Sequence, residues 1–213
     1  MLRLHPGELG FPDPQFYDPP HGLIAIGGDL SPARLLLAYT HGIFPWFNEG
    51  EELLWWCPDP RFVLFPHEVK LSKSMRKVLK DDTFGFSENQ AFEEVIRSCR
   101  TVNGRDSEGT WLSEELIDSF LFLHRQGIAH SVEVWQDGWL VGGFYGMKIG
   151  DVFCGESMFA RVSNASKAGF IHFVTTRKDL RLVDCQIHSA HLESLGARSV
   201  PKREFLSYLP SHR

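Results

Sequence analysis

The feature that most constrains this fold is a change of hydrophobic period between residues 130 and 159. In this stretch the side chains follow a period of two, which is typical of β-strands, whereas the flanking segments follow the period of an amphipathic helix. Asp137-Gly138 and Gly150-Asp151 divide the stretch with residue types that favour tight turns. The sequence therefore predicts three antiparallel strands over residues 130–135, 139–149 and 152–159.

Helices are predicted on both sides of these strands along the chain. Residues 89–100 and 113–127 precede them, and the second helix is capped by Ser113 and closed by Gly127. Residues 163–178 follow as a helix, and residues 181–187 as a further strand. This order predicts an α+β or α/β fold with a mixed sheet, and it is similar to the N-acetyltransferase, or GNAT-like, topology.

The segment after the third strand bears on the acyl donor. Acetyl-CoA-dependent members of that fold usually carry a glycine-rich pyrophosphate loop at this place. Here the segment is SMFARVSNASK, residues 157–167, and it contains no glycine. Backbone amides approach a pyrophosphate less freely without glycine. The sequence therefore favours an acyl donor other than acyl-CoA.

Composition excludes several classes of protein. The 213 residues suit one large domain or two small ones, and 43% hydrophobic residues are ample for a buried core. The four cysteines are spaced singly, so neither a zinc ribbon nor a dense disulfide framework is expected, and a reducing compartment is the natural setting. The chain shows no N-terminal secretion signal and no apolar run of about 20 residues. We expect a soluble cytoplasmic protein that does not contact a membrane.

A short helix and an aromatic segment mark the N-terminal part. Ser31 is a good cap for a helix over residues 32–40, after a proline-rich stretch expected to be extended. The segment that follows is unusually aromatic for a loop. Two interpretations stay open: a small separate core, and a surface on which a planar ligand such as a base stacks. The aromatic residues are Phe44, Trp46, Phe47, Trp55 and Trp56.

A local basic surface is the main candidate for nucleic-acid contact, because the formal net charge of the chain is −5. The helix predicted after Ser72 places its basic residues on one face, opposite an apolar face. This stripe is either a solvated surface or a contact for RNA phosphates. It consists of Lys73, Arg76, Lys77 and Lys80.

Polar residues near the end of the chain form the main candidate for chemistry. On a strand, Asp184 and Gln186 would share one face, and Cys185 would point the other way as a small core residue. An ionised Asp184 could accept a hydrogen bond from the Gln186 amide, so that the amide oxygen faces a ligand. A structural Asp–Gln pair remains the alternative. His188 and His191 are too few and too poorly placed to predict a zinc site.

Glu156 is a second candidate, because its neighbours are apolar. By alternation it would share a face with Cys154 and Met158. A carboxylate among apolar side chains requires a cationic partner, which could be Arg161, Lys167 or a cationic substrate.

A series of distinctive motifs runs from about residue 22 to the C-terminus. They are GGDLSPARLL, GIFPWF, WWCPDPR, EGTW, HSVEVW, LVGGFYG, FCGESMF, NASK and DCQ…H…SLGA. In their residues and their order, these motifs resemble the leucyl/phenylalanyl-tRNA–protein transferase family. The resemblance implies an α+β fold with a small N-terminal domain, residues 1–62, and a GNAT-like catalytic domain, residues 63–213, whose mixed, mainly antiparallel sheet is flanked by helices.

The resemblance also implies an activity. Such an enzyme moves Leu or Phe, and to some extent Met, from aminoacyl-tRNA to the N-terminal amine of proteins beginning with Arg or Lys. The product carries a degradation signal of the bacterial N-end rule. The resemblance implies no metal and no cofactor beyond the aminoacyl-tRNA co-substrate, and we expect a monomer.

Residue roles follow from the same resemblance, motif by motif. Asp184 and Gln186 would be the catalytic pair, and Glu156 would meet the positive charge of the acceptor's Arg or Lys. The basic stripe would contact tRNA phosphates. Tyr39, Trp46 and Trp111 would hold the 3′-terminal adenosine. The pocket for the Leu or Phe side chain would comprise Phe144, Phe153, Phe170 and Phe173.

Three other functions are weighed against this one. A CoA-dependent N-acetyltransferase would share the fold, but the missing glycines disfavour it. An aminoacyl-tRNA-dependent ligase for cell-wall peptides would share the donor and differ in the acceptor. A non-catalytic adaptor for tRNA or protein N-termini would bind the same partners without turnover.

Overall fold

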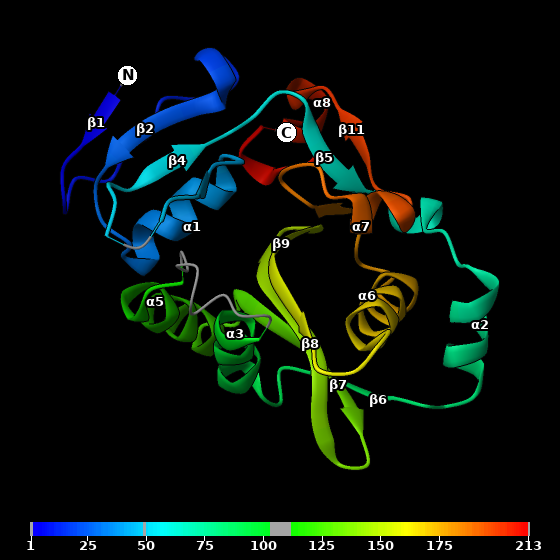
Figure 1. Cartoon of the computed structure of the whole chain (residues 1–213). Helices are drawn as coiled ribbons and strands as arrows, with labels where there is room; N and C mark the ends of the chain where they lie inside the picture. The colour runs from blue at the N-terminus through cyan, green and yellow to red at the C-terminus, as the bar shows by residue number, and fades with distance from the viewer. Residues whose placement is uncertain (1, 49, 103–111, 213) are drawn as a thin grey trace.

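Two β-sheets, one small and one large, organise the chain (Figure 1). The computed structural model describes residues 2–48, 50–102 and 112–212. The small sheet has the strand order β1-β2-β4-β3 and the large sheet the order β11-β5-β10-β9-β8-β7-β6. The strands of the small sheet are β1 (Leu2–Leu4), β2 (Leu23–Gly27), β3 (Phe44–Pro45) and β4 (Leu54–Trp56). Those of the large sheet are β5 (Arg61–Leu64), β6 (Gly85–Glu88), β7 (Ala129–Gln136), β8 (Trp139–Ile149), β9 (Val152–Ala160), β10 (Leu182–Asp184) and β11 (Arg198–Val200).

The predicted meander is confirmed as β7, β8 and β9, with bounds that agree with the prediction to within one residue. Adjacent strands pair antiparallel along their length. Between β7 and β8, Asp137 and Gly138 both adopt a positive φ, of 52° and 80°, as the favoured two-residue hairpin turn requires. The turn therefore fixes the pairing of β7 and β8 at the hairpin end, up to the register shift between Val134 and Trp135.

Helices cover both faces of the large sheet (Figure 1). Helices α3 and α5 pack on one face of the meander, and α6 packs on the other. Two apolar clusters result, one on each face. The helices are α1 (Pro32–Thr40), α2 (Lys73–Lys80), α3 (Phe92–Thr101), α5 (Glu114–Arg125), α6 (Ala165–Thr176), α7 (Ala190–Ser194) and α8 (Lys202–Leu206). Within the described ranges, no helix is long and apolar enough to cross a membrane.

The large sheet is mixed and mainly antiparallel, as predicted, and the α+β class is confirmed. Its single parallel pair among the described strands is β9 with β10. The element order meander, helix, parallel strand, helix, from which the GNAT-like topology was predicted, is also confirmed. Strand β5 enters this sheet beside β10, so the segment directly after the small sheet borders the region where β9 and β10 separate.

The N-terminal aromatic segment packs mainly into the apolar cluster on the α3 face of the large sheet, so the interpretation of a small separate core is wrong. The predicted helix 32–40 is confirmed as α1, and the Ser31 hydroxyl accepts the N–H of Arg34 at its start. The side chains of Phe44, Phe47 and Trp55 are buried. Trp56 is partly buried against the same cluster. Trp46 is 49% exposed, so its ring is the most accessible of the five to a ligand.

The predicted strand over residues 181–187 is wrong in its second half. Strand β10 ends at Asp184, and Gln186 adopts a φ of +63°, which an extended strand does not allow. The Asp184 carboxylate accepts the backbone N–H of Gln186 at 2.9 Å. An aspartate that bonds the backbone two residues ahead favours a turn over a strand.

Candidate functional site

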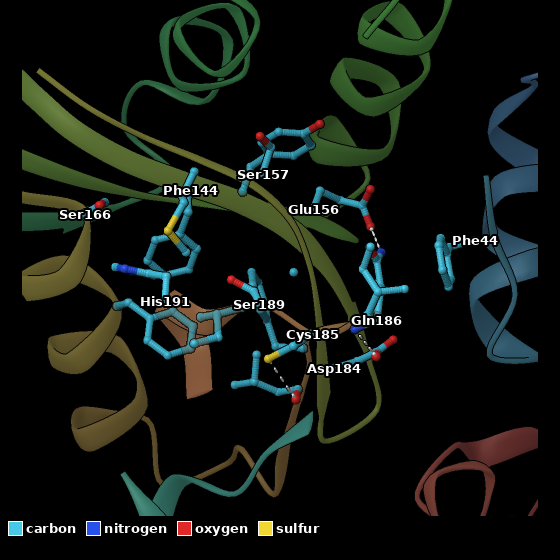
Figure 2. Close-up of a pocket in the computed structure, with 18 of the residues that line it drawn as sticks. Phe44, Phe144, Glu156, Ser157, Ser166, Asp184, Cys185, Gln186, Ser189 and His191 are labelled. Atoms are coloured by element: carbon cyan, nitrogen blue, oxygen red, sulfur yellow. Dashed lines mark hydrogen bonds between the residues drawn. The ribbon is translucent and has the colours of Figure 1, made fainter. Parts of the chain in front are cut away.

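A cavity of about 480 Å³ opens where β9 and β10 stop pairing (Figure 2). The second half of β9 forms one wall, and the segment after β10 forms another. Helices α6 and α7 close it on one side, and the β3 segment borders it on the other. The cavity brings together Trp46, Phe144, Phe153, Glu156, Phe170, Asp184 and Gln186, which are seven of the residues that the sequence predicts for the site.

Glu156 occupies a β-bulge in β9. Tyr145 of β8 faces Ser157, and the next residue, Gly146, faces Gly155, so Glu156 is the extra residue between them. Such a bulge shifts the alternation of side chains along the strand. Cys154 packs into the cluster on the α3 face, whereas Met158 packs against the cluster on the α6 face. The prediction that these two residues share a face with Glu156 is therefore wrong for Met158.

The carboxylate of Glu156 contacts polar groups from other elements. Gln186 Nε2 donates to Glu156 Oε1 at 2.9 Å, as Figure 2 shows. Burial raises the pKa of Glu156 to about 8; the nearby Tyr39 hydroxyl opposes this rise, and the charge of Asp184 adds to it. The Tyr39 hydroxyl faces the carboxylate without reaching hydrogen-bond geometry. Arg161 is not the partner of Glu156, because its guanidinium donates to Ser98 Oγ and the Leu140 carbonyl.

Asp184 is fully buried and ion-paired. Arg61 Nε donates to Asp184 Oδ1, and Arg61 Nη2 donates to Asp184 Oδ2, both at 2.7 Å. Asp184 Oδ1 also accepts the backbone N–H of Gln186. The prediction that Asp184 accepts the side-chain amide of Gln186 is therefore wrong, because that amide donates to Glu156 instead.

Gln186 sits at the centre of a tight turn. The N–H of Ile187 donates to the carbonyl of Cys185 at 2.8 Å, which closes a three-residue turn around Gln186. A positive φ at a residue other than glycine is uncommon and is held only by its surroundings. Among the residues that the structure describes, none donates to the amide oxygen of Gln186. That oxygen is the acceptor which the site offers to a ligand.

The apolar end of the cavity is built from phenyl rings. Phe144, Phe153 and Phe170 line it. Phe173 lies behind them, with its ring centroid 4.8 Å from that of Phe153 and 5.5 Å from that of Phe144. The space beside the polar groups is thus suited to a branched aliphatic or aromatic side chain.

His188 and Cys185 of this segment are engaged by other groups. His188 Nε2 lies 3.1 Å from Glu193 Oε2, and Cys185 packs at the edge of the apolar cluster on the α6 face. Burial raises the pKa of the Cys185 thiol, which disfavours a thiolate nucleophile. In the described part of the chain, no group of three or more His, Cys, Asp or Glu residues is placed to hold a metal ion.

Comparison with known proteins identifies the family. The family model for the leucyl/phenylalanyl-tRNA protein transferase matches residues 63–210, and the model for the N-terminal domain of the same family matches residues 28–59. The chain belongs to the leucyl/phenylalanyl-tRNA–protein transferase family. The predicted family is confirmed, and with it the enzyme class, an aminoacyltransferase.

Individual relatives agree with this assignment. A leucyl/phenylalanyl-tRNA–protein transferase from Flavobacterium johnsoniae is 55% identical over 89% of this chain and 91% of its own length. One from Christiangramia forsetii is 52% identical over 98% of this chain and 100% of its own. Among solved structures, a GCN5-related N-acetyltransferase from Kribbella flavida matches with a TM-score of 0.39 and 10% identity, over 84% of this chain and 63% of its own. That last likeness is too distant to carry an argument.

The residues that the family resemblance assigns to tRNA binding differ in how exposed they are in the structure. Trp46 lies at the cavity with an exposed ring. Tyr39 is buried, with 1% of its surface exposed, so its ring offers no face to a base and only its hydroxyl points toward the site. Trp111 lies outside the described residues. The four basic residues of α2 are exposed, and Met75 on the opposite face is buried; both interpretations of this stripe remain open.

Sequence reasoning missed one residue of the site, Arg61. Its signal is a single cation in the apolar stretch RFVLF, matched by a single acid in the apolar strand LVD. Lone charges in two buried strands are stable only as partners. Pairing these two strands would have predicted the contact.

Proposed function

We propose that this enzyme transfers leucine or phenylalanine, and to some extent methionine, from aminoacyl-tRNA to the α-amine of proteins that begin with Arg or Lys. Family membership supports the reaction type. The observation that carries the proposal is the cavity, in which a carboxylate and an amide meet directly beside a phenyl-lined space. A polar group for an amine and an apolar pocket for a side chain are what the two substrates require.

The proposed geometry assigns a task to each part of the cavity. The phenyl-lined end holds the Leu or Phe side chain, and the amide oxygen of Gln186 accepts a hydrogen bond from the acceptor's α-amine. Such an amine has a pKa near 8, so a useful fraction is neutral at pH 7. Its nitrogen attacks the ester carbonyl and the N–C bond forms. The bond from the carbonyl carbon to the ribose oxygen then breaks, and the proton lost by the amine ends on that oxygen, which leaves as the ribose hydroxyl. Orientation is then the main contribution of the protein.

Glu156 supplies the negative charge for the acceptor's Arg or Lys in this proposal. Binding a cation ionises a carboxylate whose pKa is raised by burial, because an opposite charge favours the charged form. An acceptor that begins with an acidic residue would place two carboxylates together, which disfavours it. The charge at this one position thus accounts for the choice of acceptor.

The tRNA itself is proposed to be held outside the cavity. The exposed ring of Trp46 stacks with the 3′-terminal adenosine, with Trp111 as the second predicted platform, and the basic stripe of α2 contacts the phosphates. The enzyme needs no metal or cofactor besides this co-substrate. We place its action in the cytoplasm, as a monomer that marks proteins for degradation.

The test is direct transfer. The protein is mixed with radiolabelled Phe-tRNA and a peptide that begins with Arg, and acid-stable labelled peptide is measured. Transfer should fail with a peptide beginning with Glu and with an N-acetylated Arg peptide, which keeps the side-chain charge and lacks the amine. Label in the acetylated peptide, or none in the Arg peptide, would refute the proposal.

A further inference from the structure

Arg61 occupies an unusual place for an arginine. Its side chain is 1% exposed, and its guanidinium lies between two rings, 4.7 Å from the centroid of Phe44 and 4.5 Å from that of Phe205. These rings come from β3 and α8, so three elements meet at the guanidinium. Its fork reaches both oxygens of Asp184, and these contacts together limit its freedom to move.

The fixed carboxylate of Asp184 in turn holds the turn at Gln186. Asp184 Oδ1 accepts the N–H of Gln186 at 2.9 Å, a charge-assisted bond of the stronger kind. Strand β5 adds to this on the backbone side, because Phe62 accepts the N–H of Cys185 at 2.9 Å and donates to the carbonyl of Gln186 at 3.3 Å. A left-handed conformation is unfavourable at a residue other than glycine, so the turn depends on these contacts.

The direction of the Gln186 side chain follows from the turn. With a φ of +63°, the side chain leaves the line of β10 and points its amide at Glu156 in the cavity (Figure 2). In an extended strand the same side chain would follow the alternation of β10 and lose this direction. The chain of contacts therefore runs from Arg61 through Asp184 to the backbone of Gln186, and only then to the substrates.

Stability alone does not account for a buried Arg–Asp pair. Replacing a buried ion pair with well-packed apolar side chains is often neutral or stabilising. An apolar pair, however, has no carboxylate to accept the Gln186 N–H and no guanidinium to hold such a carboxylate in place. The fork geometry, which lysine cannot reproduce, is thus what the turn requires.

We propose that Arg61 is a positioning residue for the transfer reaction: by fixing both oxygens of Asp184, it holds Gln186 in the turn that presents its amide oxygen to the attacking amine. Asp184 then acts through the backbone of Gln186 and not through its side-chain amide. The kinetic part of this inference rests on the proposed function, whereas the structural part does not.

The first test variant is Arg61→Lys, which keeps the charge and removes the fork. The kcat for Phe transfer should fall by about 10- to 100-fold, the size expected when a reacting group is misplaced by about an ångström, while KM for Phe-tRNA stays the same. The matched control is Arg198→Lys on the neighbouring strand β11, where the same kind of fork binds Glu68 away from the cavity. The control should keep the wild-type kcat.

A second variant guards against simple unfolding. Arg61→Met combined with Asp184→Leu removes both charges together, and should keep the cooperative unfolding transition because no buried charge is left unpaired. Its kcat should nevertheless fall at least as far as that of Arg61→Lys. Wild-type turnover in either folded variant would overturn the proposal, and so would loss of turnover only in proportion to the unfolded fraction.

A third measurement needs no substrate. Hydrogen exchange of the Gln186 amide, followed by NMR, should be slow in the wild type and at least tenfold faster in both variants, but unchanged in Arg198→Lys. Unchanged exchange in Arg61→Lys would overturn the proposal even if the activity fell. If the wild-type enzyme showed no transfer at all, the proposed function would fail while the exchange result still decided the role of Arg61.

Discussion

The buried carboxyl group of Glu156 should make the stability of the protein depend on pH. Burial raises its pKa from 4.5 to about 8. Ionising this carboxyl group therefore costs about 5 kcal/mol more in the folded protein than in the unfolded chain, at ~1.4 kcal/mol per pKa unit. Between these two pH values the folded protein holds a proton that the unfolded chain has released. The free energy of unfolding therefore falls as pH rises, by ~1.4 kcal/mol per pH unit from this group. The loss begins above pH 4.5 and is complete above about pH 8.

The perturbation is Glu156→Gln, which cannot ionise and keeps a side chain of the same shape. Urea unfolding, followed by tryptophan fluorescence, is measured for both proteins at pH 5.5 and pH 7.5. The free energy of unfolding of the variant minus that of the wild type should be about 3 kcal/mol larger at pH 7.5 than at pH 5.5. The matched control is Glu115→Gln on α5, which removes an exposed carboxylate away from the cavity.

Two results would refute this reasoning. A difference between wild type and Glu156→Gln that is constant across the pH range would mean that the carboxylate is ionised and solvated in the folded protein. A change in the opposite direction would mean that a cation of the protein already pairs with it. Either result would also remove the argument that the acceptor's positive charge is what ionises Glu156.

Further outcomes concern the substrates. Calorimetry of an Arg-peptide binding at pH 7, repeated in buffers of different ionisation enthalpy, should show about one proton more released in the wild type than in Glu156→Gln; equal release in both would contradict the pairing. Tyr39→Phe removes the hydroxyl that lowers the pKa of Glu156, so the pH at which peptide binding is half-maximal should rise; a fall would be inconsistent with the geometry. Trp46→Ala should raise KM for Phe-tRNA by about 5- to 150-fold, if stacking contributes the usual ~1–3 kcal/mol, without altering the peptide KM; an unchanged tRNA KM would remove Trp46 from the adenosine site. Reversing the charge of Lys77 and Lys80 should flatten the dependence of log Kd for tRNA on log salt by about two, and an unaltered slope would return α2 to the interpretation of a solvated surface.

The parts of the fold that local sequence patterns determine could be predicted from the sequence. The meander follows from its period and from its Asp-Gly and Gly-Asp turns, and the helices α1, α2 and α5 begin at the serines predicted to cap them. Each of these signals acts within a few residues, so the chain alone carries it. A small separate core around Phe44 and Trp55 was one of two open interpretations. These rings instead join the cluster on the α3 face, which depends on elements that the local sequence does not name.

The candidate site could be predicted from the sequence only in part. The residues Glu156, Asp184 and Gln186 were predicted and do lie in one cavity, but their contacts were not. Alternation along a strand assumes regular pairing, and it fails at the bulge beside Gly155 and at the turn after Asp184. Arg61 was missed because its contact with Asp184 joins residues 123 positions apart, which no local pattern reports.

The bulge in β9 means that this protein should respond very differently to substitutions and to changes of length. Most substitutions along β9 alter one wall of the cavity and leave the rest of the strand in place. Removing one residue beside Glu156 would instead restore regular pairing with β8. Met158 would stay opposite Phe144 and Phe159 opposite Gly143, but the bulge that sets Glu156 between two paired positions would be lost, and with it the direction of the carboxylate. Relatives of this chain should therefore vary in the residues around the bulge far more freely than in the number of residues between Val152 and Ala160.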